Sequence, residues 1–449
     1  MSELQHAFWD EACAQALCDE KLLAAMARFE GALALACSRA GIVPEAAART
    51  IAEVAAGASF AAAALAPAAR RASTLAIPFV KQLTEKVAAI SPEAARYVHF
   101  GATSQDVIDT GVVLCLGAAA ERLLALSRQI GDAAAGLAKR YARTPTVART
   151  LLQPAVPVPF GWKAAVWLSL LTRSHAHFRT AAPEACVLQF GGAGGTLSAY
   201  AGKGDVIAQA LAVELGLARP PVTWHSARDG FARLGAEAAI LTGTAGKIAR
   251  DVSLLMQPEV GEAAEPAAEG RGGSSAMPHK RNPVGCLNAL EAAQRAPGLA
   301  ATLLAQLTPE HERGLGQWQG QWFTLRDILC GAGSGLAAMA EVLDGLQIDE
   351  QAMRANLERS RGLVYSENVS LRLSRGLGKQ AAHALTEKLC GIATREGKNL
   401  IDVVRADPQA VAAIDAGEIA NLFEPENCFG SAPAMIERSL AEWSRSITP

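Results

Sequence analysis

The chain has 449 residues, of which 50% are hydrophobic and 19% are charged, and this balance excludes an intrinsically disordered protein. With 42 basic and 44 acidic residues the formal charge is −2, which argues against a nucleic-acid partner, because binding phosphates requires a clustered basic surplus. Alanine makes up roughly a fifth of the chain and is the strongest helix former, so we expect a mostly helical protein.

Two long helices are predicted where apolar residues recur alternately four and three positions apart, in the proline-free stretch 104–144 and in 233–257. Such narrow seams are typical of helices that pack at shallow angles in a bundle. The seams either fill an intramolecular core or also mediate contacts between subunits. Their residues are Leu116, Ala120, Leu123, Ser127, Ile130, Ala134 and Leu137 in the first helix and Leu234, Ala238, Leu241, Ala245, Ile248, Val252 and Leu255 in the second.

Strand signals are weak. A small hairpin is expected near 147–153, where β-favouring residues stand beside several prolines, and nothing resembles a βαβ alternation. We therefore expect an all-α fold with an N-terminal helical domain at 1–110, a central bundle of long helices at 111–352 and a C-terminal helical domain at 353–449.

The sequence also bears on the compartment. No stretch is long and apolar enough to span a bilayer, and the first residues lack the basic and apolar segments of a signal peptide. The nine cysteines are scattered and include no C-x-x-C pair, so no disulfide framework is indicated. We expect a cytoplasmic protein without a membrane partner.

The segment Gly270–Pro283 combines three glycines with two adjacent serines and the run Lys280-Arg281-Asn282. A serine beside a lysine can exchange a proton, while Lys280 and Asn282 can hold a carboxylate as charge builds on it. A mobile glycine-bearing loop can also close over a substrate. Composition alone favours a flexible linker that precedes a basic helix start over such a catalytic loop.

Three segments together resemble the motifs of the fumarase/aspartase superfamily. Gly273-Ser-Ser-Ala-Met-Pro-His-Lys-Arg-Asn282 is similar to its GSSxMPxKxN signature, Arg96-Tyr-Val-His-Phe-Gly-Ala-Thr-Ser-Gln-Asp106 to its first motif and Arg149-Thr-Leu-Leu-Gln153 to its second. The resemblance implies a three-domain helical fold whose central bundle forms a 20-helix tetramer core. It also implies that motifs from three subunits assemble each active site, and that Ser274 is the catalytic base.

Within the superfamily the chain resembles the bacterial 3-carboxy-cis,cis-muconate cycloisomerases most, and the adenylosuccinate lyases, which release fumarate, are the alternative. The lyases carry a histidine in the second motif, where this chain has Leu151. An apolar side chain cannot exchange protons. A cycloisomerase tolerates the change, because its leaving group is a carboxylate, which departs without a proton, whereas an amine nitrogen needs one.

The resemblance implies conversion of 3-carboxy-cis,cis-muconate to 4-carboxymuconolactone through an aci-carboxylate intermediate, in protocatechuate degradation by the beta-ketoadipate pathway. No metal and no cofactor are expected, and the partners are a small tricarboxylate substrate and three further copies of the chain in a homotetramer. Ser274 would transfer the proton, and Lys280 and Asn282 would bind the carboxylate that becomes the aci-acid. Substrate binding is expected from His99, Thr103, Ser104, Gln153 and Arg313, the last as a bidentate guanidinium clamp.

Overall fold

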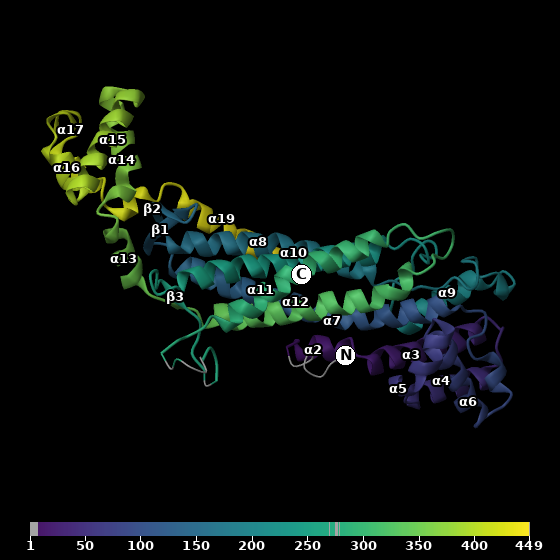
Figure 1. Cartoon of the computed structure of the whole chain (residues 1–449). Coiled ribbons are helices and arrows are strands. Elements are labelled where there is room, and N and C mark those ends of the chain that lie inside the picture. The colour runs from purple at the N-terminus through teal and green to yellow at the C-terminus, as the bar shows by residue number, and fades with distance from the viewer. Residues whose placement is uncertain (1–7, 269, 274–276, 278, 449) are drawn as a thin grey trace. The chain divides into compact units, whose positions relative to one another are not determined.

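The computed structural model describes residues 8–268, 270–273, 277 and 279–448, which form two compact units (Figure 1). Unit 1 comprises the described residues of Met1–Ser127, Ser174–Ala245 and Ala289–Ala337. Unit 2 comprises those of Arg128–Arg173, Gly246–Asn288 and Ala338–Pro449. The fold is all-α, as predicted, apart from two small two-stranded sheets. The three-domain division with boundaries near 110 and 352 stays a prediction.

Five long helices contribute a segment to each unit, and within each unit these segments lie side by side (Figure 1). Both helices predicted from the seams are present, and all fourteen seam residues are buried, which confirms the bundle core. The long helices are α7 (Ser104–Arg140), α8 (Phe160–Ala185), α10 (Asp229–Leu255), α11 (Val284–Ala305) and α12 (Gln317–Asp344).

Unit 1 adds short helices to these segments, and α3 packs against both α4 and α9. Among the described residues no single helix is long and apolar enough to cross a membrane; α4 and α5 reach that length only together, with a bend of 116° between them. The additional helices are α2 (Glu11–Ala16), α3 (Asp19–Arg39), α4 (Glu45–Gly57), α5 (Ala62–Ala72), α6 (Ala76–Ala88) and α9 (Gly204–Leu215).

Unit 2 contains the predicted hairpin, formed by the antiparallel strands β1 (Pro145–Thr150) and β2 (Gln153–Pro159). A second small sheet pairs β3 (Ala263–Ala264) with β4 (Gln347–Ile348). The C-terminal helices have their own apolar core, around residues such as Leu385, Leu389 and Val404. The helices that form this core are α14 (Ser366–Leu377), α15 (Lys379–Glu396), α16 (Leu400–Ala406), α17 (Pro408–Ala413) and α18 (Ala416–Asn421), and unit 2 also contains α13 (Glu350–Arg359) and α19 (Ala432–Ser446).

Helix α19 packs closely against α7 at a glycine. A Cβ atom on Gly131 would lie 2.2 Å from the ring of Trp443, whose indole N–H donates to Asp132 at 2.9 Å. Five residues further along the same helix, a Cβ atom on Gly136 would meet nothing within 4 Å. The two glycines therefore have opposite roles: the first provides space, and the second only weakens the helix.

We predict that Gly131→Ala destabilises the protein and Gly136→Ala stabilises it. Overpacking at Trp443 should cost about 1–3 kcal/mol, whereas alanine at an open helical position should contribute roughly 0.5–1 kcal/mol. Thermal unfolding followed by circular dichroism measures both shifts, with Gly136→Ala as the matched control. Equal shifts for the two variants would contradict the close packing of α19 on α7.

Candidate active site

The predicted site residues that the structure describes fall into two groups, one in each unit. Unit 1 holds four of them on α7, on the segment before it and on the segment before α12, whereas unit 2 holds three on the hairpin and on the loop before α11. Ser274 lies outside the described residues. The unit 1 group is His99, Thr103, Ser104 and Arg313, and the unit 2 group is Gln153, Lys280 and Asn282.

A buried carboxylate, Asp106, organises the unit 1 group. It accepts the backbone N–H of Thr103 at 3.0 Å and so caps the first turn of α7. It also accepts the backbone N–H groups of Gly191 and Gly192, at 3.0 and 2.9 Å, and contacts Nε2 of His225 at 2.7 Å. One side chain thus joins the N-terminus of α7, the turn at Gly191 and Gly192 (the glycine-rich turn) and the segment that contains His225.

The hydroxyls of Thr103 and Ser104 remain available beside this cap. Both side chains are half-buried, and neither hydroxyl has a hydrogen-bond partner among the described residues. They stand at the N-terminus of a 37-residue helix, where the helix dipole favours negative charge. Two free hydroxyls at this end of a helix are suited to bind a carboxylate.

Arg313 is held near the same helix end by backbone and amide oxygens. Its Nε donates to Gln105 at 3.1 Å, and its Nη2 donates to the carbonyls of Ala193 and Gly192 at 3.2 and 3.4 Å. Gln105 is itself fixed, because its amide donates to the carbonyl of His225 at 2.9 Å. The Nη1 group has no partner within the part of the chain that is described, so the guanidinium can still bind an anion.

His99, the fourth residue of this group, has a left-handed backbone with φ of 57°, and its Nδ1 lies 2.6 Å from Glu30 on α3. Glu30 lies outside the three motifs. Its only sequence signal is a charged residue within the apolar run Phe29–Leu33, and buried charges of this kind are paired.

In unit 2 the two arms of the segment Gly270–Pro283, here called the glycine-serine loop, are joined by hydrogen bonds. The backbone N–H of Asn282 donates to the carbonyl of Gly272 at 2.8 Å, and its side-chain amide donates to Gly273 at 3.4 Å. Gly272 has φ of 71°, and a Cβ there would lie 2.7 Å from a backbone oxygen, so only glycine fits. Lys280 is exposed on the same loop, and its backbone N–H donates to Met277.

A second carboxylate fixes the base of this loop. Glu265 accepts the backbone N–H groups of Gly285 and Cys286 at 3.1 and 2.8 Å, in the first turn of α11. Arg271, on the other arm of the loop, forms an ion pair with Glu265 at 3.5 Å, and Arg281 donates to the carbonyl of Glu265 at 3.1 Å. The loop is thereby attached at both ends to one buried acid.

The second motif forms the turn of the hairpin. Thr150 pairs with Gln153, and the two residues between them, Leu151 and Leu152, have φ of 51° and 66°. Positive φ at both central residues is the geometry of a type I′ turn, which leucine rarely adopts. The two leucines are 96% and 75% exposed, and Gln153 is exposed beside them.

The hairpin is anchored by Glu262, which is fully buried. Arg149 binds it through two nitrogens, at 2.7 and 3.1 Å, and Thr146 donates to it at 3.1 Å. The amide of Asn356 on α13 donates to the same carboxylate at 2.7 Å. Four hydrogen bonds to one buried acid hold β1 in place while the turn stays exposed.

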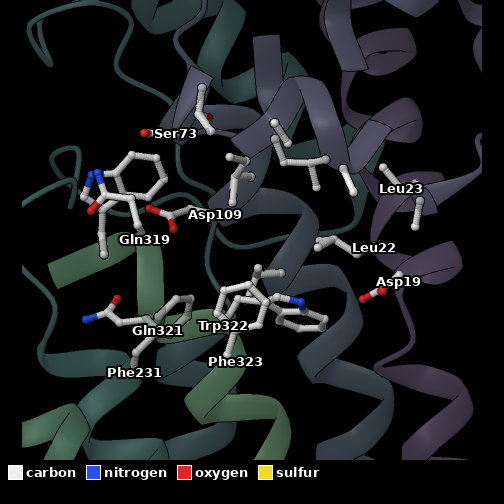
Figure 2. A pocket seen from close by; sticks show the side chains of 18 residues that line it. Asp19, Leu22, Leu23, Ser73, Asp109, Phe231, Gln319, Gln321, Trp322 and Phe323 are labelled. Carbon is white, nitrogen blue, oxygen red and sulfur yellow. The ribbon is translucent and has the colours of Figure 1, made fainter. Parts of the chain in front are cut away.

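A cavity of about 450 Å³ lies elsewhere in unit 1, among α3, α5, α7, α10 and α12 (Figure 2). Trp318 and Trp322 line it and are 8% and 7% exposed. The lining includes Asp19 and Asp109 but no cationic side chain, and none of the predicted site residues. The cavity lining therefore offers no cation that could bind a tricarboxylate.

Asp109 belongs to a buried network whose residues lie outside the three motifs. Arg228 donates to it at 2.6 and 3.1 Å and to the amide oxygen of Gln321 at 2.8 Å. The guanidinium carbon of Arg228 lies 4.7 Å from the ring centre of Trp224. This cluster joins α7, the start of α10 and α12, and so supports the elements that carry Ser104 and Arg313.

Comparison with known proteins agrees with this arrangement. The lyase family model matches residues 2–298, and the model of the adenylosuccinate lyase C-terminus matches residues 362–439. The chain is 47% identical to the 3-carboxy-cis,cis-muconate cycloisomerase of Bradyrhizobium diazoefficiens, over 99% of each chain. It is 40% identical to the nitrosuccinate lyase of Streptomyces davaonensis, over 96% of this chain and 93% of that one.

Among solved structures, the chain is similar to the 3-carboxy-cis,cis-muconate lactonizing enzyme of Pseudomonas putida. The TM-score is 0.94 and the identity 40%, with 100% of both chains covered. The chain therefore belongs to the lyase family that its three motifs indicated, the fumarase/aspartase superfamily.

Proposed function

We propose that the protein is a 3-carboxy-cis,cis-muconate cycloisomerase, an intramolecular lyase that forms 4-carboxymuconolactone. The observation that carries the proposal is the hairpin turn, where the second motif presents the apolar Leu151 beside Gln153, while the hydroxyl, amide and guanidinium donors of the other motifs stay in place. These donors suit a substrate that bears three carboxylates. They also suit a reaction whose leaving group, a carboxylate, needs no proton to depart.

In the forward reaction, a substrate carboxylate oxygen attacks an alkene carbon and closes the lactone ring. The C–O bond forms as the π electrons move toward the neighbouring carbon and the carboxylate attached to it, which becomes a doubly charged aci-carboxylate. A proton then adds to that carbon. Ser274 is the proposed donor of this proton and, in the reverse reaction, the base that removes it.

The aci-carboxylate is the species that most needs stabilisation. Lys280 and Asn282 are proposed to bind it from the loop before α11, since a cation and an amide donor lower the energy of a developing negative charge by several kcal/mol. The proposed ligands of the remaining carboxylates are His99, Thr103 and Ser104, together with Gln153 and Arg313.

A homotetramer is proposed, with each active site completed by segments from different subunits. The support is the hairpin turn: Leu151 and Leu152 are large, apolar and exposed, and a turn of this kind is costly to leave in water. A cytoplasmic location is proposed with it.

The activity is tested with the purified protein and 3-carboxy-cis,cis-muconate. We expect the ultraviolet absorbance of the conjugated diene to disappear as the lactone forms, at a rate of at least about 1 per second. Adenylosuccinate is the control substrate, because it would release fumarate if the protein were a C–N lyase. Fumarate release together with an unchanged diene spectrum would contradict the proposal.

Ser274→Ala should lower kcat by at least about a thousandfold, because the variant lacks the group that transfers the proton. Ser275→Ala is the matched control, since it removes the neighbouring hydroxyl of the same loop, and it should retain far more activity. Initial rates in the diene assay, with thermal unfolding to verify folding, measure both. Full activity of Ser274→Ala would remove the serine from the mechanism.

Arg313→Lys should raise KM about tenfold or more while kcat and the unfolding midpoint change little. A lysine keeps the charge but cannot donate to Gln105 and the two carbonyls while it also offers a forked pair of donors to the substrate. Arg143→Lys, at an exposed position, is the control. An unchanged KM would show that Arg313 serves only to hold the glycine-rich turn.

A further inference from the structure

The contact between Glu30 and His99 is a buried acid–base pair of unit 1, and the proposed mechanism gives Glu30 no role. Oε1 of Glu30 lies 2.6 Å from Nδ1 of His99. Glu30 is 1% exposed in the middle of α3, and its second oxygen, Oε2, is buried with no hydrogen-bond partner in the described parts of the chain. A purely structural position of this kind would be filled more favourably by an apolar residue.

The backbone around His99 is held as firmly as its ring. His99 has φ of 57° and Gly101 has φ of 73°, and the hydroxyl of Tyr200 donates to the carbonyl of Phe100 between them at 2.6 Å. A Cβ atom on Gly101 would lie 2.5 Å from the ring of Tyr200. A histidine kept in a left-handed conformation, between a clamped carbonyl and a buried acid, has one fixed orientation.

The other ring nitrogen of His99, Nε2, has no hydrogen-bond partner among the described residues, and the side chain is 18% exposed. The ring is therefore fixed from behind at Nδ1 and partly open at Nε2. Thr103 and Ser104, whose hydroxyls are free, follow within five residues. A histidine that only filled the core would have both ring nitrogens hydrogen-bonded. In His99 the Nε2 atom is left available to donate to a ligand.

We propose that Glu30 is a positioning residue that fixes the His99 ring through Nδ1 and keeps it as an imidazolium whose Nε2–H binds a carboxylate of the substrate. This inference rests on the proposed function, because it assigns the Glu30–His99 pair to recognition of the same tricarboxylate. It separates two roles: His99 contacts the substrate, and Glu30 acts only through His99.

The charges that face His99 support an imidazolium. Burial alone would lower the pKa of His99, but the charge and hydrogen bond of Glu30 on α3, with a further contribution from Asp106 on α7, raise this pKa above its usual value. Asp106 is itself engaged by His225 and three backbone N–H groups. Because the folded pKa is raised, the cation persists to higher pH, and substrate binding should weaken only as pH rises through that value.

The test replaces Glu30 by Gln, which can still accept a hydrogen bond from Nδ1 but carries no charge. We expect KM for carboxymuconate at pH 8 to rise about tenfold with kcat much less affected, and the rise of KM with pH to begin at least about one pH unit lower. Glu30→Asp, which keeps the charge, should restore much of the original pH profile. Asp10→Asn is the matched control: it removes another buried, ion-paired carboxylate of unit 1, bound to Arg122 at 2.7 Å, and should leave the pH profile unchanged.

A second measurement does not depend on substrate. Nuclear magnetic resonance of the histidine ring protons gives the pKa of His99 directly, with the signal assigned by its loss in His99→Gln, and Glu30→Gln should lower that pKa. An active enzyme in which Glu30→Gln changes neither the His99 titration nor the pH dependence of KM would overturn this inference and leave the proposed function intact. A wild-type protein that does not consume carboxymuconate would refute the proposed function, and with it the substrate role of the pair, even if the titration showed the pairing.

Discussion

The main constraint on this structure is that a carboxylate buried away from water is costly unless the protein supplies its hydrogen bonds. Three acids meet that requirement by binding backbone or cationic groups from segments distant in the sequence. Asp106 holds the first turn of α7 against the glycine-rich turn 191–192. Glu262 anchors the hairpin, and Glu265 anchors the loop before α11.

Each of these acids lies behind a segment that carries a motif, and none is itself the proposed reactive group. Asp106 leaves the hydroxyls of Thr103 and Ser104 free at the helix end, and Glu262 holds the hairpin while its turn stays exposed. The hydrogen bonds that stabilise each buried carboxylate therefore also fix the positions of the neighbouring donor groups. An active site must be held by supporting residues whose own positions are fixed by packing and hydrogen bonds, and the three acids meet this requirement.

Much of the fold could be predicted from the sequence, because helix periodicity is local information. The seam of α10 from Leu234 to Leu255 can be predicted from the spacing of apolar residues alone, and every one of its residues is buried. The hairpin was also predictable, from β-favouring residues beside prolines, but its unusual turn was not. Leu151 and Leu152 carry no local preference for positive φ, so the turn is imposed by the pairing of β1 with β2 and by Glu262.

The sequence by itself determined the family, the long helices and the identity of the motif residues, since motifs and seams are patterns of neighbouring positions. Only the tertiary structure decided what supports those residues. Glu30 and His99 are 69 positions apart, Asp106 and His225 119, and Arg228 and Gln321 93. No local pattern encodes such a pairing, because each partner is selected by the close approach of two helices or loops and by the cost of leaving a buried charge without a partner.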